Sequence, residues 1–312
     1  MGQVDLCNQA EVRRLLDKYG LSPKKGYGQN FLINTNVPYR IAEESYGIAC
    51  THGGERHGVL EIGPGVGALT QYLCDTYEKV VAVEIDTGLI PLLQEALGDC
   101  ENLTVVNTDF MELDLASFLE EHFGEIIQSG GTVSVCANLP YYITTPVLMK
   151  LLDAFPYCKP VPLAGITVMV QLEVARRLCA SAGSSDYGSI SAAIAMRASA
   201  SKLFDVSAGN FLPVPKVASA VCGIVPHGGI REIYGACPAD DEGCEAFARD
   251  VAEFIRLAFG QRRKTLLNAV GERYSKAEAA AALESCGIRP DVRGEKLSVE
   301  QFCEIVGKLK NK

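Results

Sequence analysis

Apolar strand-like segments alternate with helix-like segments along residues 58–171, and this alternation constrains the fold more than any other feature. The five strand-like segments are 58–62, 79–86, 102–109, 132–142 and 163–171. Strands that alternate with helices are typical of a parallel sheet that helices cover on both faces. We therefore expect an α/β fold with a Rossmann-like, doubly wound sheet. A helix at 188–200 and a strand near 219–225 are expected to complete it.

The composition changes towards the C-terminus. Residues 226–243, PHGGIREIYGACPADDEG, are rich in Gly, Pro and acidic side chains, which is typical of a linker. Three helix-like stretches follow, at about 244–270, 276–286 and 298–310. We therefore predict a large α/β domain at 1–226, a linker at 227–243 and a small all-α domain at 244–312.

The charge distribution limits how this chain can bind nucleic acid. The whole chain has a formal net charge of −9, which disfavours non-specific binding to RNA or DNA. Residues 244–312 carry 13 basic and 10 acidic side chains, a net charge of +3. Any contact with nucleic acid is therefore expected to come from local basic clusters.

Other features of the composition argue against several classes of protein. No apolar run approaches the ~20 residues of a membrane span, and the first twenty residues carry charges where a signal peptide has an apolar core. The 12 cysteines form no CxxC pair, and the 4 histidines do not cluster with them at metal-ligand spacing. We therefore expect a cytoplasmic protein with no metal and no membrane partner. Nothing suggests an obligate oligomer, so we expect a monomer.

A glycine-rich turn, GPGVG at 63–67, follows the first strand and opens a helix. Without side chains at these positions, the backbone can approach a ligand closely, and the helix N-terminus attracts negative or polar groups. The spacing is GxGxG, because residue 68 is Ala, and it therefore departs from the GxGxxG of dinucleotide sites. The turn alone is weak evidence for a binding site, because a turn with a purely structural role can have the same glycine pattern.

Two carboxylates at the ends of the next strands strengthen the signal. Glu84 ends the second strand, where an acidic side chain typically accepts the ribose hydroxyls of an adenosine ligand. Asp109 ends the third strand, where a carboxylate can accept a hydrogen bond from the adenine amino group. Each acid alone is more often a solvated charge, but with Gly63 they would line one crevice. The absent second phosphate-turn glycine favours S-adenosylmethionine over NAD.

The sequence NLPY, at 138–141, ends the fourth strand. Pro140 holds Leu139 in an extended conformation, which fixes the direction of its carbonyl group. The Asn138 side-chain oxygen and the Leu139 carbonyl oxygen can accept hydrogen bonds from the two N–H groups of an exocyclic amine. Tyr141 can stack on a base, and such stacking contributes about 1–3 kcal/mol. Attack of an amine on a methyl sulfonium is a direct displacement, in which proximity and orientation do most of the work. Asn138, Leu139 and Tyr141 are therefore the predicted catalytic residues.

These motifs resemble the ribosomal RNA small subunit adenine dimethyltransferases, the KsgA/RsmA family, over nearly the whole chain. The segments that carry the resemblance are KKGYGQNFL (24–32), EIGPGVGALT (61–70), VVAVEID (80–86), NLPYYITTP (138–146), MVQLEVARRLCASAGSSDYGSIS (169–191), FLPVPKVASAV (211–221) and FGQRRKTLLNAV (259–270). The resemblance implies a class I S-adenosylmethionine-dependent methyltransferase domain with an N-terminal lid segment, followed by a small helical domain that contacts RNA. It implies N6,N6-dimethylation of two adjacent adenosines in the 3′-terminal hairpin loop of 16S rRNA, during late assembly of the 30S subunit.

The resemblance also implies roles for individual residues. The expected cofactor contacts are Asn30, Leu32, Gly63, Glu84, Asp109 and Asn138. Phe211 resembles the second aromatic residue that stacks on the target base, and Pro213 and Pro215 would stiffen its loop. Arg262, Arg263 and Lys264 are expected to contact RNA phosphates from a helix; such contacts position RNA without reading its sequence.

Two positions depart from the family pattern, and they leave alternatives open. Ala218 stands where Asp is usual, and Leu172 stands where Lys is usual. Both lie outside the cofactor motif, so they put an RNA contact or a local ion pair in doubt. The alternatives are a methyltransferase that acts on large-subunit rRNA and a non-catalytic ribosome assembly or RNA-binding factor. An NAD oxidoreductase conflicts with the glycine spacing.

Overall fold

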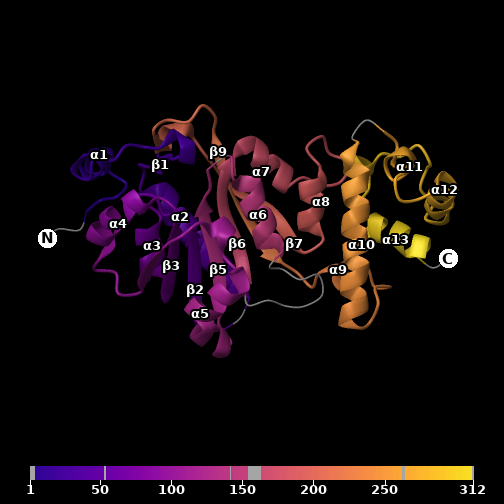
Figure 1. Cartoon of the computed structure of the whole chain (residues 1–312), viewed down its shortest axis with the longest axis horizontal. Helices are drawn as coiled ribbons and strands as arrows, with labels where there is room; N and C mark the ends of the chain where they lie inside the picture. Colours follow the sequence, from indigo (N-terminus) through magenta and orange to yellow (C-terminus); the bar gives the residue numbers. More distant parts are fainter. Residues whose placement is uncertain (1–3, 53, 141, 154–162, 262–263, 311–312) are drawn as a thin grey trace. The chain divides into compact units, whose positions relative to one another are not determined.

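The computed structural model describes residues 4–52, 54–140, 142–153, 163–261 and 264–310, and contacts divide them into two compact units (Figure 1). Unit 1 holds the described residues up to 153 together with 163–175 and 201–225. Unit 2 holds 176–200 and 226–310. Each unit has a hydrophobic core of its own.

Unit 1 is built on a seven-stranded sheet in the order β4-β3-β2-β5-β6-β9-β7. The strands are β2 (His57–Ile62), β3 (Lys79–Glu84), β4 (Leu103–Asn107), β5 (Thr132–Asn138), β6 (Leu163–Gln171), β7 (Ala198–Val206) and β9 (Ser219–Pro226). The first five strands in this order are parallel. All of β2 and most of β3, β5 and β6 are buried, as expected for the central strands of a sheet covered on both faces. The doubly wound sheet predicted from the sequence is therefore confirmed.

The far side of the sheet differs from the all-parallel expectation. β9 pairs antiparallel with β6, and β7 begins inside the 188–200 segment that was predicted to be helical. There the helix is only α8 (Ser189–Ala195). The residues of β7, ASASKLFDV, do not have a strong intrinsic preference for a strand, so pairing with β9 overrides local propensity.

Helices connect the successive parallel strands. The connecting helices are α3 (Thr70–Thr76), α4 (Ile90–Leu97), α5 (Leu115–Gln128) and α6 (Thr144–Asp153), whereas α2 (Asn36–Thr51) precedes β2 and α7 (Leu172–Leu178) follows β6. α2 lies against β5 and β6, and α5 lies against β5 and β2. Because the connected strands are parallel, their carboxyl ends meet at one edge of the sheet, and this edge carries the site.

The N-terminal segment returns to that edge of the sheet. α1 (Gln9–Lys18) begins at Asn8, whose side chain accepts hydrogen bonds from the backbone N–H groups of residues 10 and 11. After the short 3₁₀ turn η1 (Lys25–Tyr27), strand β1 (Phe31–Leu32) pairs antiparallel with β8 (Phe211–Leu212). This pairing brings the segment 24–32, far from the sheet in sequence, beside the ends of the parallel strands.

Unit 2 is mostly helical. Besides α8 it contains α9 (Ile230–Ile233), α10 (Asp241–Gly260), α11 (Leu266–Ala269), α12 (Lys276–Ser285) and α13 (Val299–Lys310). Its limits differ from the sequence prediction, because residues 176–200 group with it and the expected linker 227–243 is partly ordered into α9 and the first turn of α10. Ile230 is fully buried in the core of this unit, which explains why the segment folds onto the helices. In the described part of the chain, no helix has the length and apolar character needed to cross a membrane.

Candidate cofactor and substrate site

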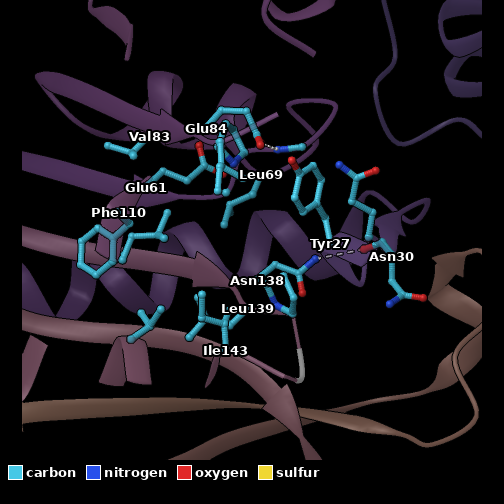
Figure 2. Close-up of a pocket in the computed structure, with 18 of the residues that line it drawn as sticks. Tyr27, Asn30, Glu61, Leu69, Val83, Glu84, Phe110, Asn138, Leu139 and Ile143 are labelled. Carbon is cyan, nitrogen blue, oxygen red and sulfur yellow. Dashed lines mark hydrogen bonds between the residues drawn. The ribbon is translucent and has the colours of Figure 1, made fainter. Parts of the chain in front are cut away.

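A cavity opens at the carboxyl ends of β2, β3 and β5, and it lies wholly within unit 1 (Figure 2). Its empty space, including the open mouth, is about 960 Å³. The structure brings together all the cofactor contacts expected from the sequence together with Leu139. These residues are Asn30, Leu32, Gly63, Glu84, Asp109, Asn138 and Leu139. Two of them, Asn30 and Asn138, lie 108 residues apart in the chain.

Glu84 is the last residue of β3, and its carboxylate is nearly buried at one wall of the cavity. Its Oε2 accepts a hydrogen bond from the Gly65 N–H at 3.1 Å, and its Oε1 accepts one from the Asp86 N–H at 2.8 Å. Burial raises the pKa of Glu84, although these backbone hydrogen bonds oppose the shift. A carboxylate oxygen can accept more than one hydrogen bond. The oriented Glu84 side chain therefore retains the capacity to accept hydrogen bonds from two ligand hydroxyls.

The glycine-rich turn forms the floor of the cavity beside Glu84. Gly63 and Gly65 have φ angles of +71° and +62°, a left-handed conformation that a residue with a Cβ rarely adopts. A Cβ on Gly63 would meet nothing within 4 Å, so the missing side chain leaves open space at the cavity floor. A Cβ on Gly65 would lie 3.2 Å from the ring of Phe31, which packs over the turn.

Asp109 and Phe110 continue the wall beyond β4. Asp109 begins the 3₁₀ turn η3 (Phe110–Glu112), and one of its oxygens, Oδ1, accepts a hydrogen bond from the Met111 N–H at 2.8 Å. Phe110 is nearly buried and presents its ring to the cavity (Figure 2). This corner therefore combines an apolar ring with a carboxylate, which suits a flat heterocycle that carries an amino group.

Asn138 is the last residue of β5, and it contacts the N-terminal segment. Its Nδ2 donates a hydrogen bond to the Asn30 carbonyl oxygen at 3.2 Å (Figure 2). This bond fixes the amide so that Oδ1 is the remaining acceptor. The strand ends here, before the residue 142 predicted from the sequence, because Pro140 has no N–H to donate to the ladder. Leu139 is held in place by its N–H, which donates to the Met169 carbonyl at 3.3 Å.

Sequence reasoning did not place Glu61 in the site. This residue lies in β2 just before the glycine turn, is 1% exposed and lines the cavity. Its Oε2 has no hydrogen-bond partner among the described residues. Burial raises the pKa of Glu61 to about 8, and the nearby Glu84 adds to the shift. A Glu within an otherwise apolar strand was the sequence signal that could have identified it.

The residues that line the cavity are suited to an adenosyl sulfonium ligand. Glu61 and Glu84 are buried acids that would attract a positively charged group when ionised, and Oε2 of Glu61 has no hydrogen-bond partner among the described residues. The glycine floor permits close approach of a ligand to the backbone. Val83, Leu69, Ile143 and Phe110 supply apolar wall (Figure 2). Among the described residues no group of His, Cys, Asp and Glu side chains is arranged to hold a metal ion.

Some of the remaining predicted residues do not line this cavity, and the others lie outside the residues that the structure describes. Phe211 is 2% exposed, sits in β8 opposite Leu32 and belongs to the hydrophobic core of unit 1. Tyr141, Arg262 and Arg263 lie outside the described residues. Lys264 is exposed, but it lies in the turn between α10 and α11, so its predicted place on a helix is wrong.

The strand order, the glycine turn and the strand-end carboxylates define the class of the protein, which is a class I S-adenosylmethionine-dependent methyltransferase. Comparison with known proteins identifies the family within this class. The ribosomal RNA adenine dimethylase family matches residues 20–311, and the chain therefore belongs to this family.

Named relatives agree with this assignment, and solved structures agree with the fold. The chain is 39% identical over 311 residues to ribosomal RNA small subunit methyltransferase A of Bacillus licheniformis, covering 98% of each chain. It is also 39% identical over 310 residues to the Bacillus mycoides protein of the same name, covering 98% of this chain and 97% of the relative. A dimethyladenosine transferase from Plasmodium falciparum aligns with a TM-score of 0.64 at 21% identity, covering 88% of this chain and 95% of that one. The 23S rRNA methyltransferase ErmE aligns with a TM-score of 0.63 at 23% identity, covering 90% and 99%. Both structures support the fold.

Proposed function

We propose that this protein transfers methyl groups from S-adenosylmethionine to N6 of two adjacent adenosines in the 3′-terminal hairpin loop of small-subunit rRNA, giving N6,N6-dimethyladenosine. The observation that carries the proposal is the Asn138 amide, which is fixed by the Asn30 carbonyl on the wall of the same cavity as Glu84 and Asp109. One cavity thus offers an adenosine-binding edge and an acceptor for an exocyclic amine.

The chain's own residues divide the work of binding. Glu84 would accept the ribose hydroxyls, Asp109 the adenine amino group, and the backbone of Gly63 would pass beside the ligand. Asn30 and Leu32 would close the cavity from the N-terminal side. S-adenosylmethionine, when bound, supplies a methyl group on a positively charged sulfur. The Glu61 carboxylate, whose Oε2 has no hydrogen-bond partner among the described residues, would stabilise positive charge in the cavity once it loses its proton.

The target amine would be held by Asn138 Oδ1 and the Leu139 carbonyl. When these two oxygens accept hydrogen bonds from both N–H groups of the amine, the nitrogen lone pair points towards the cavity. Orientation of this kind can supply a large part of the rate enhancement. Tyr141 would stack on the base. Phe211 would take the opposite face, and this role requires its ring to leave the core position that it occupies in this structure.

The choice of small-subunit rRNA rests on the relatives that share 39% identity over nearly the whole chain, because they bear the name of small-subunit enzymes. We further propose that the substrate is the immature 30S subunit, that the enzyme works in the cytoplasm as a monomer, and that Arg262, Arg263 and Lys264 contact RNA phosphates. Unit 2 would then be the RNA-contacting part of the molecule, and unit 1 the catalytic part.

The proposal is tested with tritiated S-adenosylmethionine. The protein is incubated with small subunits from a strain that lacks this modification, with large subunits and free rRNA in parallel. We expect label in the small subunits alone, recovered as N6,N6-dimethyladenosine on two adjacent adenosines. Label in the large subunits would identify the sister activity, and binding to small subunits without incorporation would identify a non-catalytic assembly factor.

A further inference from the structure

The segment 24–32 is fastened to the end of β3 by one carboxylate. Lys24 Nζ lies 2.6 Å from Asp86 Oδ1, and Gln29 Nε2 donates to Asp86 Oδ2 at 3.0 Å. The two donors also hold each other, because the Lys24 N–H donates to Gln29 Oε1 at 2.8 Å. The carboxylate of Asp86 is therefore the point where the segment is tied to the sheet.

Asp86 is a buried group and is unlike an ordinary surface ion-pair partner. Its side chain is 3% exposed, whereas the Lys24 side chain is 47% exposed. Burial alone would raise the pKa of Asp86, but the hydrogen bonds from Lys24 and Gln29 outweigh it and hold the pKa below its usual range. A surface ion pair contributes little, but loss of one partner from a buried, hydrogen-bonded charge is costly.

The same residue also orients the cavity carboxylate. The Asp86 N–H donates to Glu84 Oε1 at 2.8 Å, and Glu84 in turn accepts from the glycine turn. The Gly88 N–H donates to Asp86 Oδ1 at 3.1 Å, which fixes the side chain against its own loop. The fastening of the N-terminal segment and the orientation of Glu84 therefore share one residue.

The far end of the segment contacts the other walls of the cavity. The Asn30 carbonyl accepts the hydrogen bond from Asn138, and the ring of Phe31 packs over Gly65. Gly28 lies so close to Pro140 that a Cβ at position 28 would come within 3.2 Å of the Pro140 side chain. The segment thus spans the cavity from the end of β3 to the end of β5.

We propose that Asp86 is a positioning residue that latches segment 24–32 over the cavity and so couples closure of this segment to cofactor binding. The proposal rests on the proposed function and deepens it. Asp86 does not line the cavity, so it acts through Lys24, Gln29 and Glu84. If the latch is weakened, the closed form is populated less, and the apparent affinity for cofactor falls by the same fraction.

The experiment uses the full chain and S-adenosylhomocysteine, the product form of the cofactor, as the probe. Binding is measured by calorimetry for Asp86→Asn, Lys24→Met and Lys24→Arg, with Lys202→Met as the matched control. Lys202 makes an exposed ion pair with Asp205, also in unit 1 and away from the cavity. Hydrogen exchange of a peptide that covers residues 24–32 is followed in the absence and presence of the probe.

We expect the dissociation constant to rise about 10- to 100-fold for Asp86→Asn and Lys24→Met, as for a lost charged hydrogen bond. Exchange of 24–32 should be faster in both variants without the probe. Lys24→Arg should lie close to wild type because it restores the charge, and Lys202→Met should be unchanged. In turnover, the KM for cofactor should rise while kcat at saturation is largely kept, a separation that general loss of stability does not produce.

Unchanged affinity in both Asp86→Asn and Lys24→Met would overturn the proposal. Weaker binding with unchanged exchange of 24–32 would also overturn it, because Asp86 would then act through Glu84 alone. Lys24 tests the latch even if Asp86→Asn does not fold, since its side chain is half exposed. If wild-type protein binds no probe at all, the proposed function fails, and the exchange rates without probe still decide the latch.

Discussion

Replacing Glu61 by Gln should make the protein more stable at neutral pH and remove a pH dependence that the wild type shows. Glu61 is 1% exposed, and burial raises its pKa from 4.5 to about 8 in the folded protein. Between these values the folded state binds a proton that the unfolded state has lost. The free energy of unfolding therefore falls as pH rises, by about 1.4 kcal/mol per pH unit for this one group. The stabilisation from the protonated form is complete below about pH 4.5 and is lost as pH rises through about 8.

The shift from 4.5 to about 8 corresponds to a loss on the order of 4–5 kcal/mol across this range, an upper limit for a single buried carboxyl. The assay is urea unfolding of cofactor-free wild type and Glu61→Gln at intervals from pH 5 to pH 8. Other titrating groups contribute to both proteins, so the difference between them isolates Glu61. We expect the two to be similar near pH 5 and the variant to be more stable by several kcal/mol near pH 8. Parallel curves at all pH values would refute the reasoning.

Four further predictions follow from the same cavity. Binding of S-adenosylmethionine near pH 7 should release a proton from Glu61, visible in calorimetry as a binding enthalpy that depends on the ionisation enthalpy of the buffer; Glu61→Gln should lose this dependence. Glu84→Gln should weaken cofactor binding by about 1–3 kcal/mol in calorimetry, as for a lost charged hydrogen bond, and equal affinity would remove Glu84 from the site. Asn138→Ala should lower kcat by about 10²-fold or more, in the range seen when one positioned group is removed, with the melting temperature nearly unchanged; near-normal turnover would exclude the proposed role. Gly65→Ala should cost about 1–2 kcal/mol from the left-handed backbone, with a further cost from the Phe31 contact, whereas Gly26→Ala, where a Cβ meets nothing within 4 Å, should melt as wild type does.

Much of the fold and site was predictable because it depends on local patterns. Buried parallel strands are apolar along most of their length, so β2, β3 and β6 are visible as short hydrophobic runs. A parallel sheet places the ends of these runs at one edge, so strand-end position alone predicts that Gly63, Glu84 and Asp109 line one crevice. The glycine spacing, together with Glu84 and Asp109, then indicates S-adenosylmethionine as the ligand.

The parts that were missed depend on contacts between distant residues. β7 is a strand because β9 pairs with it, and its own residues carry only a weak preference. The segment 227–243 has the composition of a linker, but it folds onto unit 2 because Ile230 finds a place in that core. Phe211 could stack on a base by sequence pattern alone, yet pairing of β8 with β1 buries its ring in this structure.

Asp86 shows why a site cannot be completed from strand ends alone. Its sequence position, two residues after Glu84, is that of an ordinary loop acid, and nothing local distinguishes it from a solvated charge. Its partners Lys24 and Gln29 lie 62 and 57 residues earlier, so the buried ion pair exists only once the N-terminal segment has crossed the sheet. The electrostatics then separate two acids. Asp86 has a cationic partner and its pKa is lowered, while Oε2 of Glu61 has no hydrogen-bond partner among the described residues and burial raises the pKa of Glu61. A carboxylate whose charge is already compensated serves to hold the chain together, and one whose charge is not compensated is stable as an anion only when a cationic ligand arrives. The same physical chemistry therefore assigns Asp86 to closing the cavity and Glu61 to what the cavity binds.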